Sequence, residues 1–286
     1  MRRYIDETRT NHIVYDSLYE FFTLTDPNNK APDMHSGNQS GWEQIKRQDE
    51  RSWRYGDEKT KEAYHQVRFD PEKGKKMCAE SVKKVMADHT YKELVRQAMT
   101  YRKRISYEDH GFRLCVPKAI AGEDRYFSVY KNARKPIVKI AINICGSASV
   151  DQAAFIKIAN TAVPTIYALE TAGIATEVYY CAFATGTHPG DGIRHTGTHV
   201  KIKSAQQRFN WTTFAPVFTL GSYRESIFLS WIYDPHETGY GLGTPMDDAT
   251  LVKNKNYGYT AVIGLNAVGP VDQVNQVFEK IGRKEC

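Results

Sequence analysis

Residues 135–186 decide the fold: KPIVKIAINICGSASVDQAAFIKIANTAVPTIYALETAGIATEVYYCAFATG. An apolar run at 137–143 follows Pro136, and small residues at 144–149 indicate a turn. A helical pattern over 150–172 stops at Gly173, and a second β-rich run begins at Thr176. Strand, turn, helix and strand within about 50 residues predict a parallel crossover, with the turn at the carboxyl end of the first strand. Open α/β sheets bind their ligands at this edge.

The pattern outside this unit predicts an α/β fold with a mixed, mostly parallel sheet and flanking helices. We expect the sheet domain over residues 111–286, with strands at 199–203 and 257–266 and a last helix at 271–281. A Gly/Thr/His-rich loop is expected over 184–198. Residues 1–110 form a helical, basic N-terminal region that either packs on the sheet or stands alone, and they begin with an amphipathic helix over 11–23.

Composition is that of an ordinary globular chain of 286 residues, with 41% hydrophobic and 25% charged residues. No apolar run reaches the roughly 18 residues that a membrane span needs, and the charged start MRRYIDET does not resemble a signal peptide. The five cysteines are odd in number and never spaced C-x-x-C, which favours reduced thiols in a cytoplasm. No motif indicates a cofactor.

The net positive charge of the chain comes entirely from its first half. The net charge is +6, and residues 1–135 carry 27 Lys and Arg against 21 Asp and Glu, whereas residues 136–286 carry 12 against 12. Within residues 73–104 there are ten basic residues and three acidic ones. A local basic field suggests a polyanionic partner, although a solvated helix surface has the same composition.

Aromatic residues lie among these charges, as single-strand binding requires, because cations follow phosphates and rings stack on bases. Trp53 and Tyr55 lie beside Arg51 and Arg54, and Tyr101 precedes a basic triplet. The alternative is that the rings belong to the core. The predicted nucleic-acid contacts are Lys73, Lys75, Lys76, Lys83, Lys84, Arg96, Tyr101, Arg102, Lys103, Arg104, Trp53 and Arg54.

The turn after the first strand of the crossover resembles that of a von Willebrand factor A-type domain. In that family the strand ends in Asp-x-Ser-x-Ser, whose oxygens bind a divalent metal. Here Asn143 replaces the Asp and Cys145 the first Ser, and Ser147 is retained. Because hard cations prefer carboxylate oxygens, the resemblance implies a von Willebrand A-like or Rossmann-like fold without the metal, in which Asn143 and Ser147 contact a partner. The alternative is a tight turn that simply needs small residues.

Several stretches resemble an uncharacterised family encoded by tailed phages, namely 15–21, 116–117, 121–123, 140–150 and 169–173. The resemblance implies a phage origin, and hence a host cytoplasm, but no chemistry. Phages of the N4 type encode single-stranded-DNA-binding cofactors of their own RNA polymerase, and this basic, aromatic-rich chain looks like such a cofactor. A phage RNA polymerase is therefore an implied partner.

Two other groups of residues suit a ligand by type but not by spacing. His188, Asp191, His195 and His199 have the side chains that Zn²⁺ prefers, yet their irregular spacing in a Gly/Thr-rich segment favours a solvated loop. The glycines at 239, 241 and 243 lack a following Gly-Lys-Ser/Thr and do not predict a phosphate loop. We expect no metal site.

The leading hypothesis is a non-catalytic phage protein that binds single-stranded DNA and recruits an RNA polymerase. The alternative is a von Willebrand A-like adaptor that docks proteins near Asn143, Ser147 and the 184–198 loop. An enzyme ranks third, because no acid/base pair or nucleophile is predicted to converge at this edge, and no catalytic residue is assigned. A homo-oligomer is compatible with an exposed sheet edge, but no motif indicates one.

Overall fold

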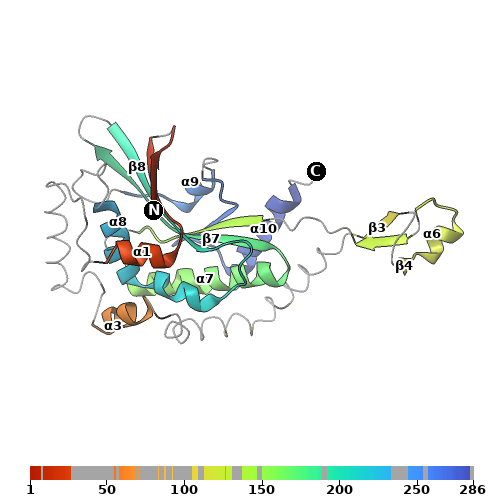
Figure 1. Cartoon of the computed structure of the whole chain (residues 1–286), viewed down its shortest axis with the longest axis horizontal. Helices are drawn as coiled ribbons and strands as arrows, with labels where there is room; N and C mark the ends of the chain where they lie inside the picture. The colour runs from red at the N-terminus through yellow and green to blue at the C-terminus, as the bar shows by residue number, and fades with distance from the viewer. Residues whose placement is uncertain are drawn as a thin grey trace.

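A computed structural model describes residues 1–7, 9–26, 55, 58–68, 70, 83, 87, 92, 105–108, 113–125, 127–130, 137–146, 150–188, 192–232, 244–253 and 257–283. These residues form a main seven-stranded sheet with helices packed on it, and a separate three-stranded sheet (Figure 1). The predicted α/β fold class is confirmed.

The main sheet has the strand order β1-β2-β8-β7-β6-β10, and β9 also pairs with β7. Its strands are β1 (Arg2–Ile5), β2 (Thr10–Tyr15), β6 (Ile137–Asn143), β7 (Ala175–His188), β8 (Gly192–Lys203), β9 (Thr244–Pro245) and β10 (Ala261–Ile263). Along this order three of the five neighbouring pairs are parallel, namely β2 with β8, β7 with β6 and β6 with β10. The sheet is therefore mixed and mostly parallel, as predicted.

The predicted crossover is the centre of the sheet. Strand β6 leads into helix α7 (Gln152–Thr171), and β7 returns parallel to β6 with Ile137 opposite Ala175. Asp151 caps the helix by accepting a hydrogen bond from the amide of Ala154 at 3.1 Å. Gly173 follows the helix with a φ of 85°, a left-handed conformation that glycine adopts without strain.

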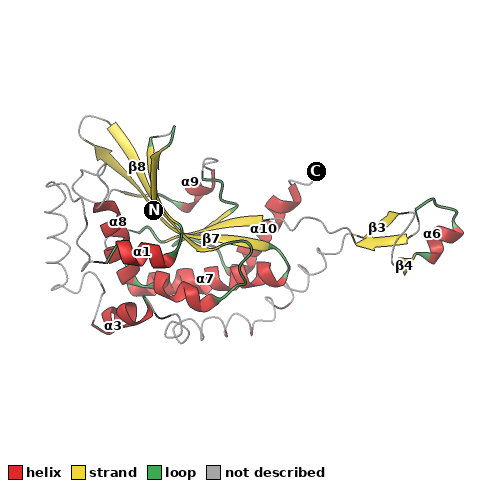
Figure 2. Ribbon diagram, in the orientation of Figure 1, coloured by secondary structure: helices red, strands yellow, loops and turns green. Residues whose placement is uncertain are grey.

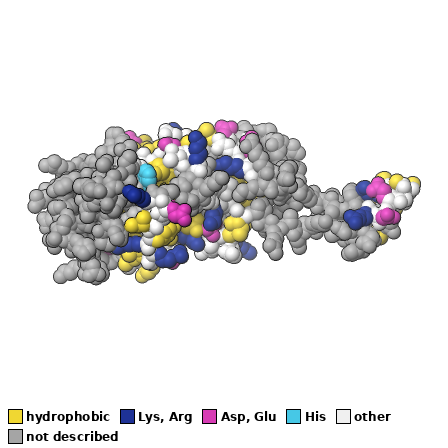
Figure 3. Space-filling model, turned by 90° about the horizontal axis from the view of Figure 1, so that it is seen from above, with side chains coloured by type: hydrophobic (Ala, Val, Ile, Leu, Met, Phe, Trp, Pro, Cys, Tyr) yellow, Lys and Arg dark blue, Asp and Glu magenta, His cyan; other side chains and the backbone are white. Residues whose placement is uncertain are grey.

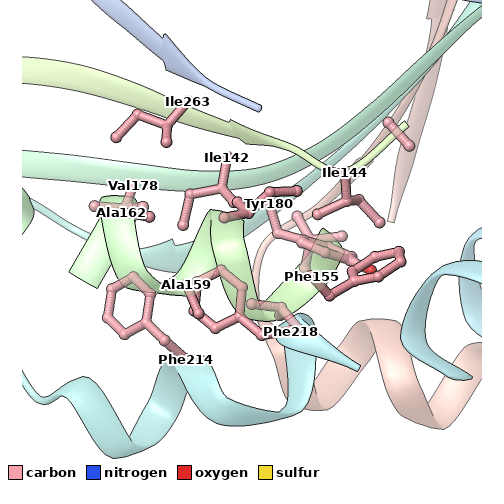
Figure 4. Packing of buried hydrophobic residues seen from close by; sticks show 14 of the residues in the cluster. Ile142, Ile144, Phe155, Ala159, Ala162, Val178, Tyr180, Phe214, Phe218 and Ile263 are labelled. Carbon is pink, nitrogen blue, oxygen red and sulfur yellow. The ribbon is translucent and has the colours of Figure 1, made fainter. Parts of the chain in front are cut away.

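Helix α7 covers one face of this unit and forms the main core. Its Phe155, Ala159 and Ala162 pack toward Ile142 and Tyr180 of the two strands (Figure 4). Strand β6 is buried on both faces from Ile140 to its end, which is why its sequence is an apolar run and not an alternation. This burial is the main driving force for the fold.

Further helices complete the two layers, as Figure 2 shows. They are α1 (Leu18–Leu24), α3 (Glu58–Val67), the 3-10 helix η2 (Trp211–Phe218), the π-helix η3 (Ser222–Ile227), α8 (Phe228–Ile232), α9 (Asp248–Lys253) and α10 (Pro270–Arg283). Leu251 of α9 belongs to a smaller apolar cluster on the opposite face of the sheet, with Phe183, Cys181, Tyr257 and Tyr259. The sheet thus has one thickly covered face and one thinly covered face.

The predicted helix over 11–23 is wrong in its first half. Residues Thr10–Tyr15 form β2, and the helix begins only at Leu18, after the N-cap Ser17. Ile13 and Tyr15 point into the main core, and β2 pairs with β8 with Tyr15 opposite Val200. Aromatic and β-branched residues suit this buried strand. The sheet therefore extends beyond 111–286 and includes residues 2–15.

The predicted loop over 184–198 is also wrong, because most of it belongs to two paired strands. Strands β7 and β8 continue as an antiparallel hairpin as far as His188 opposite Gly192. Gly197 lies where a side chain would clash, since a Cβ there would come within 2.6 Å of the Phe183 ring. The last predicted strand is shorter than expected, because only Ala261–Ile263 pairs with β6, whereas the last helix is confirmed.

The three-stranded sheet lies apart from the main sheet in Figure 1. It contains β3 (Ile105–Glu108), β4 (Arg113–Leu114) and β5 (Phe127–Tyr130) in the order β3-β5-β4, and the short helix α6 (Val116–Ile120) follows β4. Strands β3 and β5 are antiparallel, with Ile105 opposite Tyr130.

Candidate functional site

The carboxyl end of β6 carries the amide of Asn143, which the structure buries. Its Nδ2 donates to Oδ1 of Asp248 at 2.8 Å and to the carbonyl of Met246 at 3.3 Å. Its Oδ1 accepts from the amide of Cys145 at 3.2 Å. Asn143 therefore joins the turn after β6 to the start of α9, and the antiparallel pairing of β9 with β7 brings an acid to this edge that the sequence pattern did not reveal.

Asp248 lies in a tight, partly buried position. Burial raises the pKa of its carboxyl group, and the hydrogen bond from Asn143 lowers it in part. A Cβ on Gly264 would come within 2.2 Å of the Asp248 carboxylate, so this glycine is what allows the approach. The residue at position 264 thus decides whether Asp248 reaches Asn143.

The residues at this edge do not fit the divalent metal of the von Willebrand A-type family. The Asn143 amide presents N–H to Asp248, and a donor cannot ligate a cation. Burial raises the pKa of the Cys145 thiol to about 11, so the thiol stays protonated. A hydrogen bond from the Asn143 amide to the Asp248 carboxyl group thus stands where the family has a cation. Among all residues that the structure describes, no group of three or more His, Cys, Asp or Glu is arranged to hold a metal ion.

The turn itself is held by two consecutive residues of the π-helix. The hydroxyl of Tyr223 donates to the carbonyl of Gly146 at 2.7 Å and accepts from its amide at 3.2 Å. Nη2 of Arg224 donates to the carbonyl of Val150 at 2.5 Å. The described residues on either side of 147–149, Gly146 and Val150, are thus both held by the π-helix.

A second polar cluster lies under the thinly covered face of the sheet. His12 lies between two partners, with Nε2 at 3.0 Å from Oδ2 of Asp6 and Nδ1 at 2.8 Å from Nε2 of His199. The chain continues from Nδ1 of His199 to the Tyr259 hydroxyl at 2.6 Å, and from there to Sγ of Cys181 at 3.1 Å. Five strands or their flanking segments, those of β1, β2, β8, β10 and β7, are joined by this one chain.

The histidine cluster is structural in character. Burial first, and the charge of His12 second, lower the pKa of His199 to about 3, so its imidazole is neutral. Burial also raises the pKa of the Cys181 thiol to about 12. Groups whose pKa values lie this far from 7 neither supply a thiolate nor exchange protons near pH 7. Sequence reasoning missed His12 and Tyr259 because they lie far from His199 along the chain.

Of the predicted histidine group, the two members whose side chains the structure describes, His195 and His199, have separate partners. His199 points into the cluster above, whereas Nδ1 of His195 lies 2.9 Å from the Thr185 hydroxyl on the neighbouring strand. His188 ends β7, and Asp191 lies outside the described residues.

Most predicted nucleic-acid contacts lie outside the described residues, as does Ser147. Lys83 is described and exposed. The hypothesis that Tyr55 offers an exposed ring is wrong, because its side chain is buried and its hydroxyl donates to the carboxylate of Glu225. The contacts that the structure does not describe are Lys73, Lys75, Lys76, Lys84, Arg96, Tyr101, Arg102, Lys103, Arg104, Trp53 and Arg54.

The variant His199→Gln tests the neutral state of the buried imidazole. Because the pKa of His199 falls from 6.5 to about 3 on folding, the unfolded chain binds more protons between these values, and stability falls as pH drops. Urea denaturation gives the free energy of unfolding of the native protein and of the variant. We expect the excess of the native value over the variant value to shrink by up to about 1.4 kcal/mol per pH unit below pH 6.5. Plots of unfolding free energy against pH that run parallel for the two proteins would contradict this.

Comparison with known proteins adds a family but no activity. No curated protein and no solved structure matches the chain. Within the described ranges, none of the helices is both long enough and apolar enough to span a bilayer. One family model matches residues 5–283, from the first strand of the main sheet to the end of α10. The chain therefore belongs to the family described as a domain of unknown function, DUF7192.

Proposed function

We propose that this chain binds single-stranded DNA without catalysis through its basic N-terminal half, and that it acts as a phage protein in the host cytoplasm, where it recruits a phage RNA polymerase. The observation that carries the proposal is the pairing of β3 with β5. Ile105 lies opposite Tyr130, so the chain enters and leaves the three-stranded sheet at the same end.

Two basic runs are joined directly to that end. Residues 101–104 read YRKR and precede Ile105, and residues 131–135 read KNARK and follow Tyr130. Together they hold six cations and no acid. Each phosphate that such cations neutralise releases counterions, which makes the affinity salt-dependent. Tyr101 would add a ring for base stacking, worth roughly 1–3 kcal/mol per base.

The one face of the molecule seen in Figure 3 shows no large cluster of described cations on the main sheet. On the face seen in Figure 3, described Lys and Arg side chains are interspersed with Asp, Glu and apolar groups. Arg2, for example, is paired with Asp16 at 2.9 Å. The excess of positive charge in residues 1–135 supports a site in that half.

The test is fluorescence anisotropy of a labelled single strand of about 30 nucleotides and of its duplex, at two salt concentrations. We expect tight binding of the single strand that weakens steeply with salt. In Lys103→Gln/Arg104→Gln the affinity should fall by about tenfold or more, and the salt slope by about 2.

The matched control is Lys118→Gln/Arg125→Gln, which removes two charges from the described part between β4 and β5 and should change little. Absence of binding at low salt, an affinity that does not depend on salt, or equal losses in the two double variants would contradict the proposal.

A second candidate function is a protein-binding adaptor at the carboxyl edge of β6, as the von Willebrand A-like resemblance implies. Two apolar side chains beside this edge are exposed, Ile156 by 47% and Val268 by 40%. They flank a contact between Nζ of Lys157 and the carbonyl of Leu265 at 3.4 Å. Exposed apolar groups around a braced polar turn are typical of a protein interface.

Gly264→Ala tests the adaptor, because it displaces the Asp248 carboxylate from Asn143. Gly269→Ala is the control, since the nearest atom to its Cβ would be Oδ2 of Asp272 at 3.9 Å. A protein partner that is captured by the native chain and by Gly269→Ala, and lost by Gly264→Ala, would support this function. Capture by all three would exclude the Asn143 edge as the binding surface.

A further inference from the structure

The π-helix η3 interrupts a helical segment over 220–232. Its six residues, Ser222–Ile227, are all buried, and α8 continues directly from it. Short π-helical turns are rare, and they persist where side-chain contacts hold them in place. The contacts of η3 divide into two sets on two different parts of the molecule.

One set of contacts reaches the turn between β6 and α7. Tyr223 is bonded to both the amide and the carbonyl of Gly146, and Arg224 to the carbonyl of Val150. The ring of Tyr223 also packs against Phe155 in the first turn of α7, with ring centroids 5.9 Å apart. These two residues fix the turn that carries the candidate protein-binding edge.

The other set of contacts reaches the N-terminal half. Glu225 is fully buried, and its carboxylate accepts hydrogen bonds from Tyr55 and from Nη1 of Arg68, the latter at 3.3 Å. The Ser226 hydroxyl lies 2.7 Å from the hydroxyl of Tyr64 in α3. Gly221 lets these rings approach, since a Cβ there would come within 2.7 Å of the Tyr64 ring.

Only the π register satisfies both sets at once. Successive side chains of an α-helix turn by about 100°, so a shift of one residue toward an α register rotates every side chain of the segment away from its present partner. If the contacts on one side were lost, the remaining set alone would no longer hold the π register. The structure shows the π register, in which both sets of contacts form, and a shifted α register is the second arrangement that energetic coupling between the two sites requires.

We propose that η3 is a mechanical link through which the anchoring of α3 sets the geometry of the β6–α7 turn. This part rests on the proposed function. A ligand that binds the basic N-terminal half changes the affinity of the carboxyl edge for its partner. By linkage, binding of that partner changes the affinity for the ligand by the same factor. The link itself exists in the ligand-free chain.

Amide hydrogen exchange in the ligand-free chain tests the link. Tyr64→Phe removes only the hydroxyl that reaches Ser226, and this hydroxyl has no contact with the turn. We expect the amide of Gly146, which is bonded to Tyr223, to exchange about tenfold faster in this variant, a size typical of coupling through a packed network. Tyr223→Phe serves as the positive control, because it removes that bond directly.

Ser230→Ala is the matched negative control. It deletes another buried hydroxyl of the same helical segment, one that lies 2.9 Å from Thr198 Oγ1 and faces β8. The amide of Thr176, bonded to Glu170 at 2.8 Å, reports general loosening. Faster exchange at Gly146 in Tyr64→Phe alone, with Thr176 unchanged, supports the link. Unchanged exchange at Gly146, or equal acceleration in Ser230→Ala, would overturn it.

Anisotropy of the same variants with the labelled single strand separates the two proposals. Acceleration at Gly146 together with no DNA binding at low salt means that the link stands and the DNA-binding function fails. DNA binding with no acceleration at Gly146 means the opposite.

Discussion

The packing of α1 and α3 against the π-helix depends on one buried charge, the carboxylate of Glu225. A carboxylate without solvent is strongly unfavourable unless it is paired and hydrogen-bonded. Tyr55 and Arg68 satisfy it, and Nη2 of Arg68 also donates to the carbonyl of Phe22 at 2.5 Å. Helix α1, helix α3 and the π-helix thus meet at a single guanidinium group. The crossover β6-α7-β7 and the segments around it share one apolar core, which includes Phe22, Tyr55 and Tyr64 beside Ile142 and Phe155.

The two faces of the main sheet are stabilised in different ways. The face under α7 is apolar and large, and it follows from the burial of β6 and β7. The other face has a small cluster of rings and the chain from Asp6 through His12 and His199 to Tyr259. Buried polar chains of this kind fix one arrangement of strands when every member has a partner. The histidines here join β2 to β8, and they are not a metal site.

The carboxyl edge of β6 lies where open α/β sheets bind their ligands. There the amide of Asn143 donates a hydrogen bond to the carboxylate of Asp248, which joins the end of β6 to the start of α9. The basic runs beside β3 and β5 are a separate feature of the chain.

Local patterns in the sequence predicted the crossover well, and long-range contacts decided the rest. The apolar run of β6 and the stop at Gly173 are both signals within one unit. Strand β2 was predicted as a helix because Tyr15 and Phe22 fit a helical stripe, while its actual partner β8 lies far along the chain. Asp248 reaches Asn143 by the same kind of long-range contact, and a π-helical turn has no sequence signature.

The most direct test of this account is a double-mutant cycle on Arg68 and Glu225, measured by urea denaturation. Breaking a buried ion pair from one side costs about 3–5 kcal/mol, whereas apolar replacement of both partners is often close to neutral. We predict that Arg68→Met and Glu225→Leu each lose this much, and that the double variant loses far less than the sum. Additive losses would contradict the claim that this pair holds α1 and α3 to the π-helix.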